Sequence, residues 1–268
     1  MADFDNDNEQ IEKLKNLWKR FGNLILWLII IVLGAFAVWT YWQHLNQKKE
    51  VEASVGYQVL QNDLQKGLVT ETIAADANNI MQNYPKTTYA SFAALLVAKQ
   101  YVSDNNYQAA ENSLQWVLDH SDDKAVLATA NLRLARLYIA ENKAQKALDL
   151  LNNAKLPQSY QVSLNLVLAQ GYIQLANEKN ARESLLKAKS LLNQNNQDKN
   201  DPSTQLLIEQ GDKFIDMQLN NLSLLIAQVK AANQKEKNAS NNTNKVEQDK
   251  NSSAEQSEKE NSDNQSKK

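Results

Sequence analysis

The sequence of 268 residues carries 29 Lys and Arg against 31 Asp and Glu, a formal net charge of −2. Because there is no cationic excess to neutralise a phosphate backbone, nucleic acid is not expected as a partner. Cysteine is absent, which excludes disulfides, thiolate metal ligands and cysteine nucleophiles. Only 6 Gly and 3 Pro occur, which favours a fold rich in helices.

Residues 1–23 form a polar N-terminal segment that we expect in the cytoplasm. Within it, apolar residues recur at helical spacing and run directly into the apolar stretch that follows. These residues are Ile11, Leu14, Leu17, Trp18 and Phe21. The segment is either a short helix that contacts a cytoplasmic partner or an extension of the next helix along the lipid headgroups.

Residues 24–42 read LILWLIIIVLGAFAVWTYW and contain no charged side chain. A helix rises 1.5 Å per residue, so about twenty apolar residues cross a hydrocarbon core of ~30 Å. Aromatic residues lie on both sides, with Trp18 and Phe21 before and Trp39, Tyr41 and Trp42 at the end. The sequence therefore predicts a transmembrane helix in a lipid bilayer over 24–42.

The orientation follows from the flanking cations. Four cations between Lys13 and Arg20 precede the apolar stretch and only Lys48 and Lys49 follow closely. The positive-inside rule then places the N-terminus in the cytoplasm and the rest of the chain outside it, in the periplasm of a bacterium. The alternative is a signal peptide cleaved after Ala35-Phe36-Ala37, although the apolar run continues to Trp42 and the N-terminal segment is acidic.

A linker is expected over 43–50 and a helical domain over 51–229. The domain begins with a degenerate helix pair, 51–66 and 70–84, which Pro85 ends. Three repeats follow. Five residues of the second repeat recur 34 residues later in the third, and four of their counterparts in the first lie 37 residues earlier. The second-repeat residues are Ala135, Tyr138, Ala147, Leu151 and Ala154.

Thirty-four residues is the period of the tetratricopeptide repeat (TPR), a pair of antiparallel helices. The sequence therefore predicts an all-α, TPR-like solenoid. Asp201-Pro202 resembles a helix start, so residues 202–228 are expected to form a closing helix over the last repeat. Residues 230–268 are polar and lack aromatic, Leu and Ile residues, which predicts a disordered tail.

No pattern of catalytic, metal-binding or cofactor-binding residues occurs. The two histidines, His44 and His120, lie far apart, and no Gly-rich phosphate loop or nucleophile elbow is present. We therefore expect a binding protein without a cofactor, and not an enzyme.

The candidate binding site is the face of each first helix that lines a TPR groove. It is mostly apolar, which suits extended or helical apolar segments. TPR domains that clamp chaperone carboxylates carry Lys and Asn where this chain has Leu95, Leu132 and Leu166, so that ligand class is not favoured. Alternatively, the closing helix or a partner domain fills the groove permanently. The groove residues are Phe92, Leu95, Lys99, Val102, Leu132, Arg136, Ile139, Leu166, Gln170 and Ile173.

The start DFDNDNEQIEKLKNLWKRFGNLI, the single span, the central NLRLARLYI and the NNLSLL that ends the domain resemble the YfgM family, ancillary subunits of the SecYEG translocon. The resemblance covers about residues 1–225 and implies an inner-membrane protein with a periplasmic TPR domain. It also implies three partners: SecYEG, a PpiD-like membrane-anchored periplasmic chaperone, and exported unfolded chains. The long polar tail departs from the family. The alternative is a structural TPR scaffold for another envelope or cell-division complex.

Overall fold

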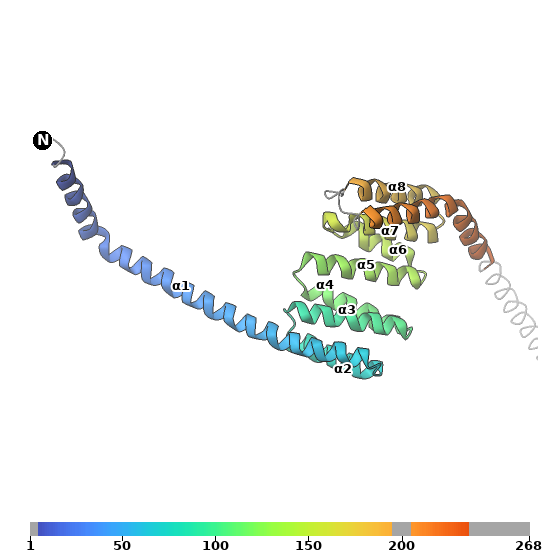
Figure 1. Ribbon diagram of the computed structural model, residues 1–268, viewed down its shortest axis with the longest axis horizontal. Coiled ribbons are helices and arrows are strands. Elements are labelled where there is room, and N and C mark those ends of the chain that lie inside the picture. Colours follow the sequence, from blue (N-terminus) through green and yellow to red (C-terminus); the bar gives the residue numbers. More distant parts are fainter. Residues whose placement is uncertain (1–4, 195–204, 236–268) are drawn as a thin grey trace, which may run out of the picture. The chain divides into compact units, whose positions relative to one another are not determined.

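The computed structural model describes residues 5–194 and 205–235, and these residues form α-helices joined by short turns (Figure 1). The all-α prediction is confirmed, because no strand occurs within these two ranges. We call the last helix, residues 205–235, the closing helix. The other elements are α1 (Asp5–Gln65), α2 (Thr70–Asn83), α3 (Thr88–Ser103), α4 (Tyr107–His120), α5 (Lys124–Ala140), α6 (Ala144–Asn153), the 3-10 turn η1 (Gln158–Tyr160), α7 (Gln161–Gln174) and α8 (Glu178–Gln194).

The chain divides into two compact units, Met1–Ala93 and Ala94–Lys268. The first contains α1, α2 and the beginning of α3. The second contains the rest of α3, the helices α4 to α8 and the closing helix.

Helix α1 contains the apolar stretch and continues beyond it to Gln65. In the described part of the chain it is the one helix whose length and composition suit a membrane span, with a mean hydropathy of 1.7 in a window that has no buried residue. The linker predicted over 43–50 is wrong, because these residues are helical and belong to α1. They contain neither Gly nor Pro, and Gln, Leu, Lys and Glu among them favour a helix.

The helix pair predicted over 51–84 is present as the end of α1 packed against α2. Ala53 and Leu60 on α1 and Ile73 and Ala77 on α2 are buried. A Cβ atom at Gly56 would lie 3.1 Å from the side chain of Ile80, so the glycine permits a close approach of the two helices.

The predicted repeat register is confirmed by three equivalent turns between paired helices. Each turn has one residue with a positive φ, four positions after the matched tyrosine: Asn105 (58°), Asn142 (59°) and Ala176 (55°). The amide of the next residue donates to the carbonyl of that tyrosine, which closes the first helix of the pair. These bonds are Asn106 to Tyr101 at 2.8 Å, Lys143 to Tyr138 at 2.8 Å and Asn177 to Tyr172 at 2.9 Å.

Small residues occupy the same place on the second helix of each pair. Ala110, Ala147 and Ala181 have no exposed surface. Each of them lies four residues beyond a turn amide described above, and a larger side chain there would separate the paired helices.

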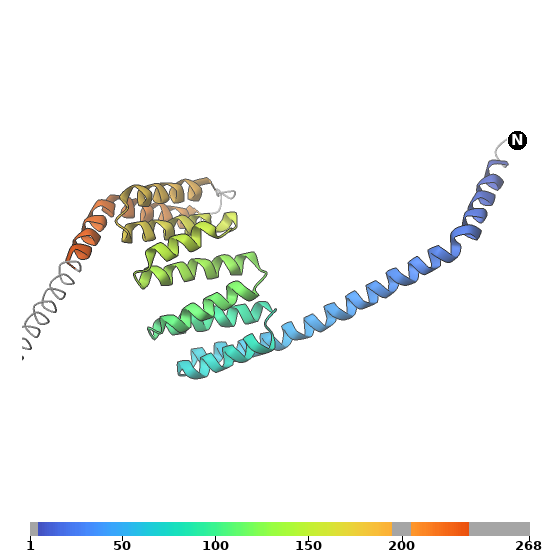
Figure 2. The same ribbon diagram turned by 180° about the vertical axis from the view of Figure 1, so that it is seen from behind.

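The closing helix packs on α7 and α8, beside which it lies in both views (Figures 1 and 2). Ile215 is buried against Ala169, Leu185 and Ala188, and further along Leu222 and Ile226 are buried against Ala181. A Cβ atom at Gly211 would lie 2.7 Å from the Cδ2 atom of Leu192, so this glycine lets the closing helix approach α8.

The closing helix continues to residue 235, so residues 230–235 are helical and not part of a disordered tail. Ala231 and Ala232 are strong helix formers that extend it. Residues 201–204, with the predicted helix start, and the tail residues 236–268 lie outside the described part of the chain.

Candidate functional site

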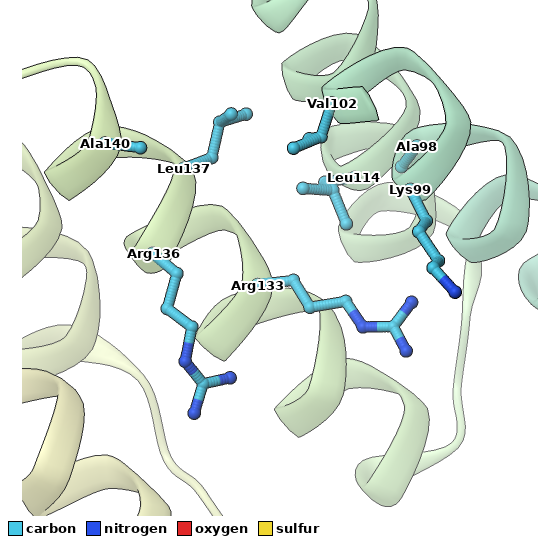
Figure 3. A pocket seen from close by; sticks show the side chains of 8 residues that line it. All are labelled: Ala98, Lys99, Val102, Leu114, Arg133, Arg136, Leu137 and Ala140. Atoms are coloured by element: carbon cyan, nitrogen blue, oxygen red, sulfur yellow. The ribbon is translucent and has the colours of Figure 1, made fainter. Parts of the chain in front are cut away.

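The second unit contains a cavity of about 410 Å³ between α3, α4 and α5, which we call the α3–α5 pocket (Figure 3). Each helix contributes side chains that project toward a common space, and the first helices of two successive repeats form its two walls. The lining residues are Ala98, Lys99 and Val102 from α3, Leu114 from α4, and Arg133, Arg136, Leu137 and Ala140 from α5.

The interior of the pocket is apolar. Ala98, Leu114 and Leu137 form its floor and are each less than 5 % exposed, so they are already packed against other side chains. The apolar surface that a ligand can reach lies at the edge of the pocket, where Val102 is 40 % exposed and Ala140 is also exposed. An apolar group that entered the pocket would therefore exchange water for packed hydrocarbon.

Three cations, Lys99, Arg133 and Arg136, also line the pocket. Arg133 Nη1 donates a hydrogen bond to the carbonyl oxygen of Leu95 at 3.0 Å, one helical turn before Lys99. The side chains of Arg133 and Lys99 extend toward one another, whereas that of Arg136, on the next turn of α5, points away from Lys99 (Figure 3). A guanidinium has five N–H donors, so Arg133 keeps free donors after binding Leu95.

No carboxylate of the described residues lies within ion-pair distance of Lys99, Arg133 or Arg136. Partial burial of the guanidinium lowers the pKa of Arg136, and the positive charge of Arg133 lowers that pKa further. The pocket is therefore a concave, positively charged site with an apolar floor, suited to an anionic group that carries an apolar neighbour.

Three residues of the predicted groove line this pocket: Lys99, Val102 and Arg136. Leu95 and Leu132 do not present a surface to a ligand, because they are 7 % and 4 % exposed. Arg133, which completes the cationic rim, was not among the predicted residues. Its spacing from Arg136, Leu137 and Ala140 is the i, i+3, i+4, i+7 pattern of one helix face, which could have identified it.

The remaining predicted residues lie elsewhere. Leu166 and Ile173 pack against the clusters that include the closing helix, while Gln170 between them is exposed. Ile139 would be 3.8 Å from a Cβ atom at Gly171, so it lies beside α7. Phe92 belongs to the first unit, where its ring lies 6.1 Å from that of Tyr57.

A second polar cluster joins α4, α5 and α6. The Tyr138 hydroxyl and Lys146 Nζ each donate to Glu111 Oε1 at 2.8 Å, and Lys146 Nζ lies 4.1 Å from the centre of the Tyr138 ring. The bond from Lys146 lowers the pKa of Glu111, and its reciprocal raises the pKa of Lys146 to about 12. Because every charge here is paired, the cluster stabilises the repeat contact and offers no free group to a ligand.

Within residues 5–194 and 205–235, no group of three or more His, Asp or Glu side chains has the arrangement of a metal site. His44 is exposed on α1. The ring of His120 stacks on Trp116 with centroids 4.3 Å apart, and its Nδ1 lies 2.9 Å from the Trp116 carbonyl oxygen.

Comparison with known families agrees with the repeat geometry. The family model described as tetratricopeptide repeat-like domain matches residues 15–223. The chain is thus a TPR-like helical-repeat protein with an N-terminal apolar helix.

Relatives of known name indicate which family of TPR-like proteins the chain belongs to. The ancillary SecYEG translocon subunit of Haemophilus influenzae is 30 % identical over 155 residues, which cover 58 % of this chain and 75 % of the relative. The subunit of the same name from Escherichia coli is also 30 % identical over 155 residues, 58 % of this chain and 74 % of the relative. The subunit of the same name from Neisseria gonorrhoeae is 25 % identical over 152 residues, which cover 57 % of this chain and 73 % of the relative.

The chain therefore belongs to the YfgM family of ancillary SecYEG translocon subunits. Neither this family nor the repeat class is a family of enzymes. No solved structure matches the chain.

Proposed function

We propose that this protein is an ancillary subunit of the SecYEG translocon. In this proposal, α1 holds it in the inner membrane with the N-terminus in the cytoplasm, and the repeat domain lies in the periplasm. There the domain binds a PpiD-like membrane-anchored chaperone, newly exported unfolded chains, or both. The names of the relatives support the translocon assignment.

The anchor part of the proposal rests on the surface of α1. Its apolar side chains are exposed along the stretch 24–42, for example Trp27 at 63 % and Ile31 at 65 %. In water such a surface is unfavourable, whereas in lipid it needs no partner. The four cations between Lys13 and Arg20 favour a cytoplasmic N-terminus.

The binding part of the proposal is carried by one observation: the α3–α5 pocket has an exposed apolar edge, Val102 and Ala140, beside three cations that no carboxylate of the described residues pairs with. Lys99, Arg133 and Arg136 are exposed, so all three are accessible to a ligand.

The test is purification of the full-length chain, tagged at its C-terminus, from membranes in a mild detergent. The proposal predicts that SecY co-purifies with the wild-type chain. Absence of SecY from the wild-type preparation would contradict the proposal. Recovery of cell-division or other envelope proteins in its place would support a structural scaffold.

A further inference from the structure

We propose that the α3–α5 pocket binds peptide segments in which a carboxylate lies beside an apolar side chain. The carboxylate would bind at Lys99 and Arg133, with the positive charge of Arg136 on the next turn of α5, and the apolar neighbour would enter the cavity beside Val102. This inference rests on the proposed function, in which the repeat domain binds exported or partner chains, and it names the chemistry of what is bound.

The positive charge of the pocket favours an anionic ligand. The three cations lie on one rim, and each lacks a carboxylate partner among the described residues. Like charges held close together repel. A ligand carboxylate relieves that repulsion and forms charge-assisted hydrogen bonds with the guanidinium groups.

One cation of the pocket is preorganised. The hydrogen bond from Arg133 to the carbonyl oxygen of Leu95 holds one guanidinium against α3 before any ligand arrives. A fixed guanidinium loses less conformational entropy on binding than a mobile one. Arg133 is therefore the positioned cation, and Lys99 and Arg136 are free to adjust to the ligand.

The apolar lining of the pocket favours a peptide ligand over a simple anion. A hydrated phosphate or lipid headgroup would contact the cations but would leave the exposed apolar side chains of the lining, Val102 and Ala140, in water. A cavity of about 410 Å³ accepts one or two apolar side chains. Acidic and apolar residues adjacent in one peptide satisfy both parts of the pocket.

The experiment measures binding to the full-length chain in neutral detergent micelles by fluorescence anisotropy. The probes are two fluorescein-labelled decapeptides, one alternating Leu and Asp and one alternating Leu and Asn. We expect the Asp peptide to bind at least tenfold more tightly than the Asn peptide, and its affinity to fall as salt is raised.

The variants are Lys99→Gln and Arg136→Gln, singly and together. Neither side chain makes a hydrogen bond or ion pair within the described residues, so the fold should survive, with circular dichroism as the check. The double variant should weaken binding of the Asp peptide at least tenfold. Lys187→Gln is the matched control, because Lys187 is an exposed lysine on α8 outside the pocket, and it should leave the affinity unchanged.

Three results would overturn the inference: equal affinity for the Asp and Asn peptides, full affinity in the folded double variant, or no binding of either peptide. Displacement of the Asp peptide by equimolar inorganic phosphate or soluble short-chain phosphatidylglycerol would also overturn it, in favour of a phosphate or headgroup site. Each of these can occur while SecY still co-purifies with the wild-type chain. The peptide inference and the translocon proposal therefore fail separately.

Discussion

Arg133 Nη1 lies 3.0 Å from the carbonyl oxygen of Leu95, and this hydrogen bond joins residues 38 positions apart in the sequence. It connects α3 with α5, the first helices of successive repeats, at the rim of the α3–α5 pocket. One interaction therefore serves both the stacking of the repeats and the placement of a cation.

Replacing Arg133 with Gln should lower the free energy of unfolding by about 1 kcal/mol, because a hydrogen bond between the repeats is lost. Arg136→Gln removes the same charge without a bond and should change it by less than about 0.5 kcal/mol. Urea denaturation of the two variants provides the comparison. Equal losses would show that the bond to Leu95 does not stabilise the stack.

Ala176→Gly should raise the free energy of unfolding by about 1 kcal/mol. Ala176 has a φ of 55°, in the left-handed region, where the two equivalent turns have Asn and where Gly carries no penalty. Ala75→Gly, at an exposed position within α2, should instead lower it by about 1 kcal/mol. Thermal melts of both variants decide the point, and a lower melting temperature for Ala176→Gly would contradict it.

Leu222→Ala should destabilise the domain by about 2 to 5 kcal/mol, because this side chain is fully buried between the closing helix and the last repeat. Leu224→Ala, two residues later on the same helix, is the control. Leu224 is 60 % exposed and should matter by less than about 0.5 kcal/mol. If limited proteolysis cuts both variants equally within residues 205–235, the packing of the closing helix is not as described.

The Glu111–Lys146 ion pair should make stability depend on pH at both extremes. The pKa of Glu111 is lowered from its ordinary value of 4.5, so its contribution is present above pH 4.5 and is lost as pH falls through the lowered pKa. The pKa of Lys146 is raised from 10.5 to about 12, so its contribution is present below pH 10.5 and is lost as pH rises through 12.

Because Lys146 is largely exposed, the pair should contribute about 0.5 to 1 kcal/mol between these limits. The measurement is the difference in unfolding free energy between wild type and Glu111→Gln from pH 3 to pH 11. A difference that stays constant below pH 4.5 would show that Glu111 is not linked to folding.

The sequence predicted the repeat fold well, because the parts of each repeat are adjacent in the sequence. The spacing of Tyr138 and Ala147 reflects a helix, a turn and a second helix within one repeat, and the turn hydrogen bonds follow that register. The sequence did not predict that α1 continues beyond the apolar stretch. Residues 43–50 offer no stop signal, and only the continuous α1 shows that the helix passes from the apolar stretch into the first helix pair.

The site was harder to predict, because the burial of a side chain in a solenoid depends on neighbours that are distant in the sequence. Leu132 and Leu166 have similar positions in their repeats, yet Leu132 is 4 % exposed while Leu166 packs near the closing helix. Helix periodicity identifies a face but cannot tell how far another helix covers it. The spacing of Arg133 places it on the same face of α5 as Arg136, but its hydrogen bond to Leu95 spans 38 residues and could not be predicted from local spacing.

The most direct measurement is photocrosslinking in living cells from a benzoylphenylalanine placed at Val102, on the accessible edge of the pocket. The control position is Gln145, which is exposed on α6 and outside the pocket. If the pocket is the periplasmic binding site of a translocon subunit, Val102 should crosslink to exported chains or to a membrane-anchored periplasmic chaperone, and Gln145 should do so far less. Crosslinks from Val102 to cytoplasmic proteins, or equal yields from the two positions, would contradict it.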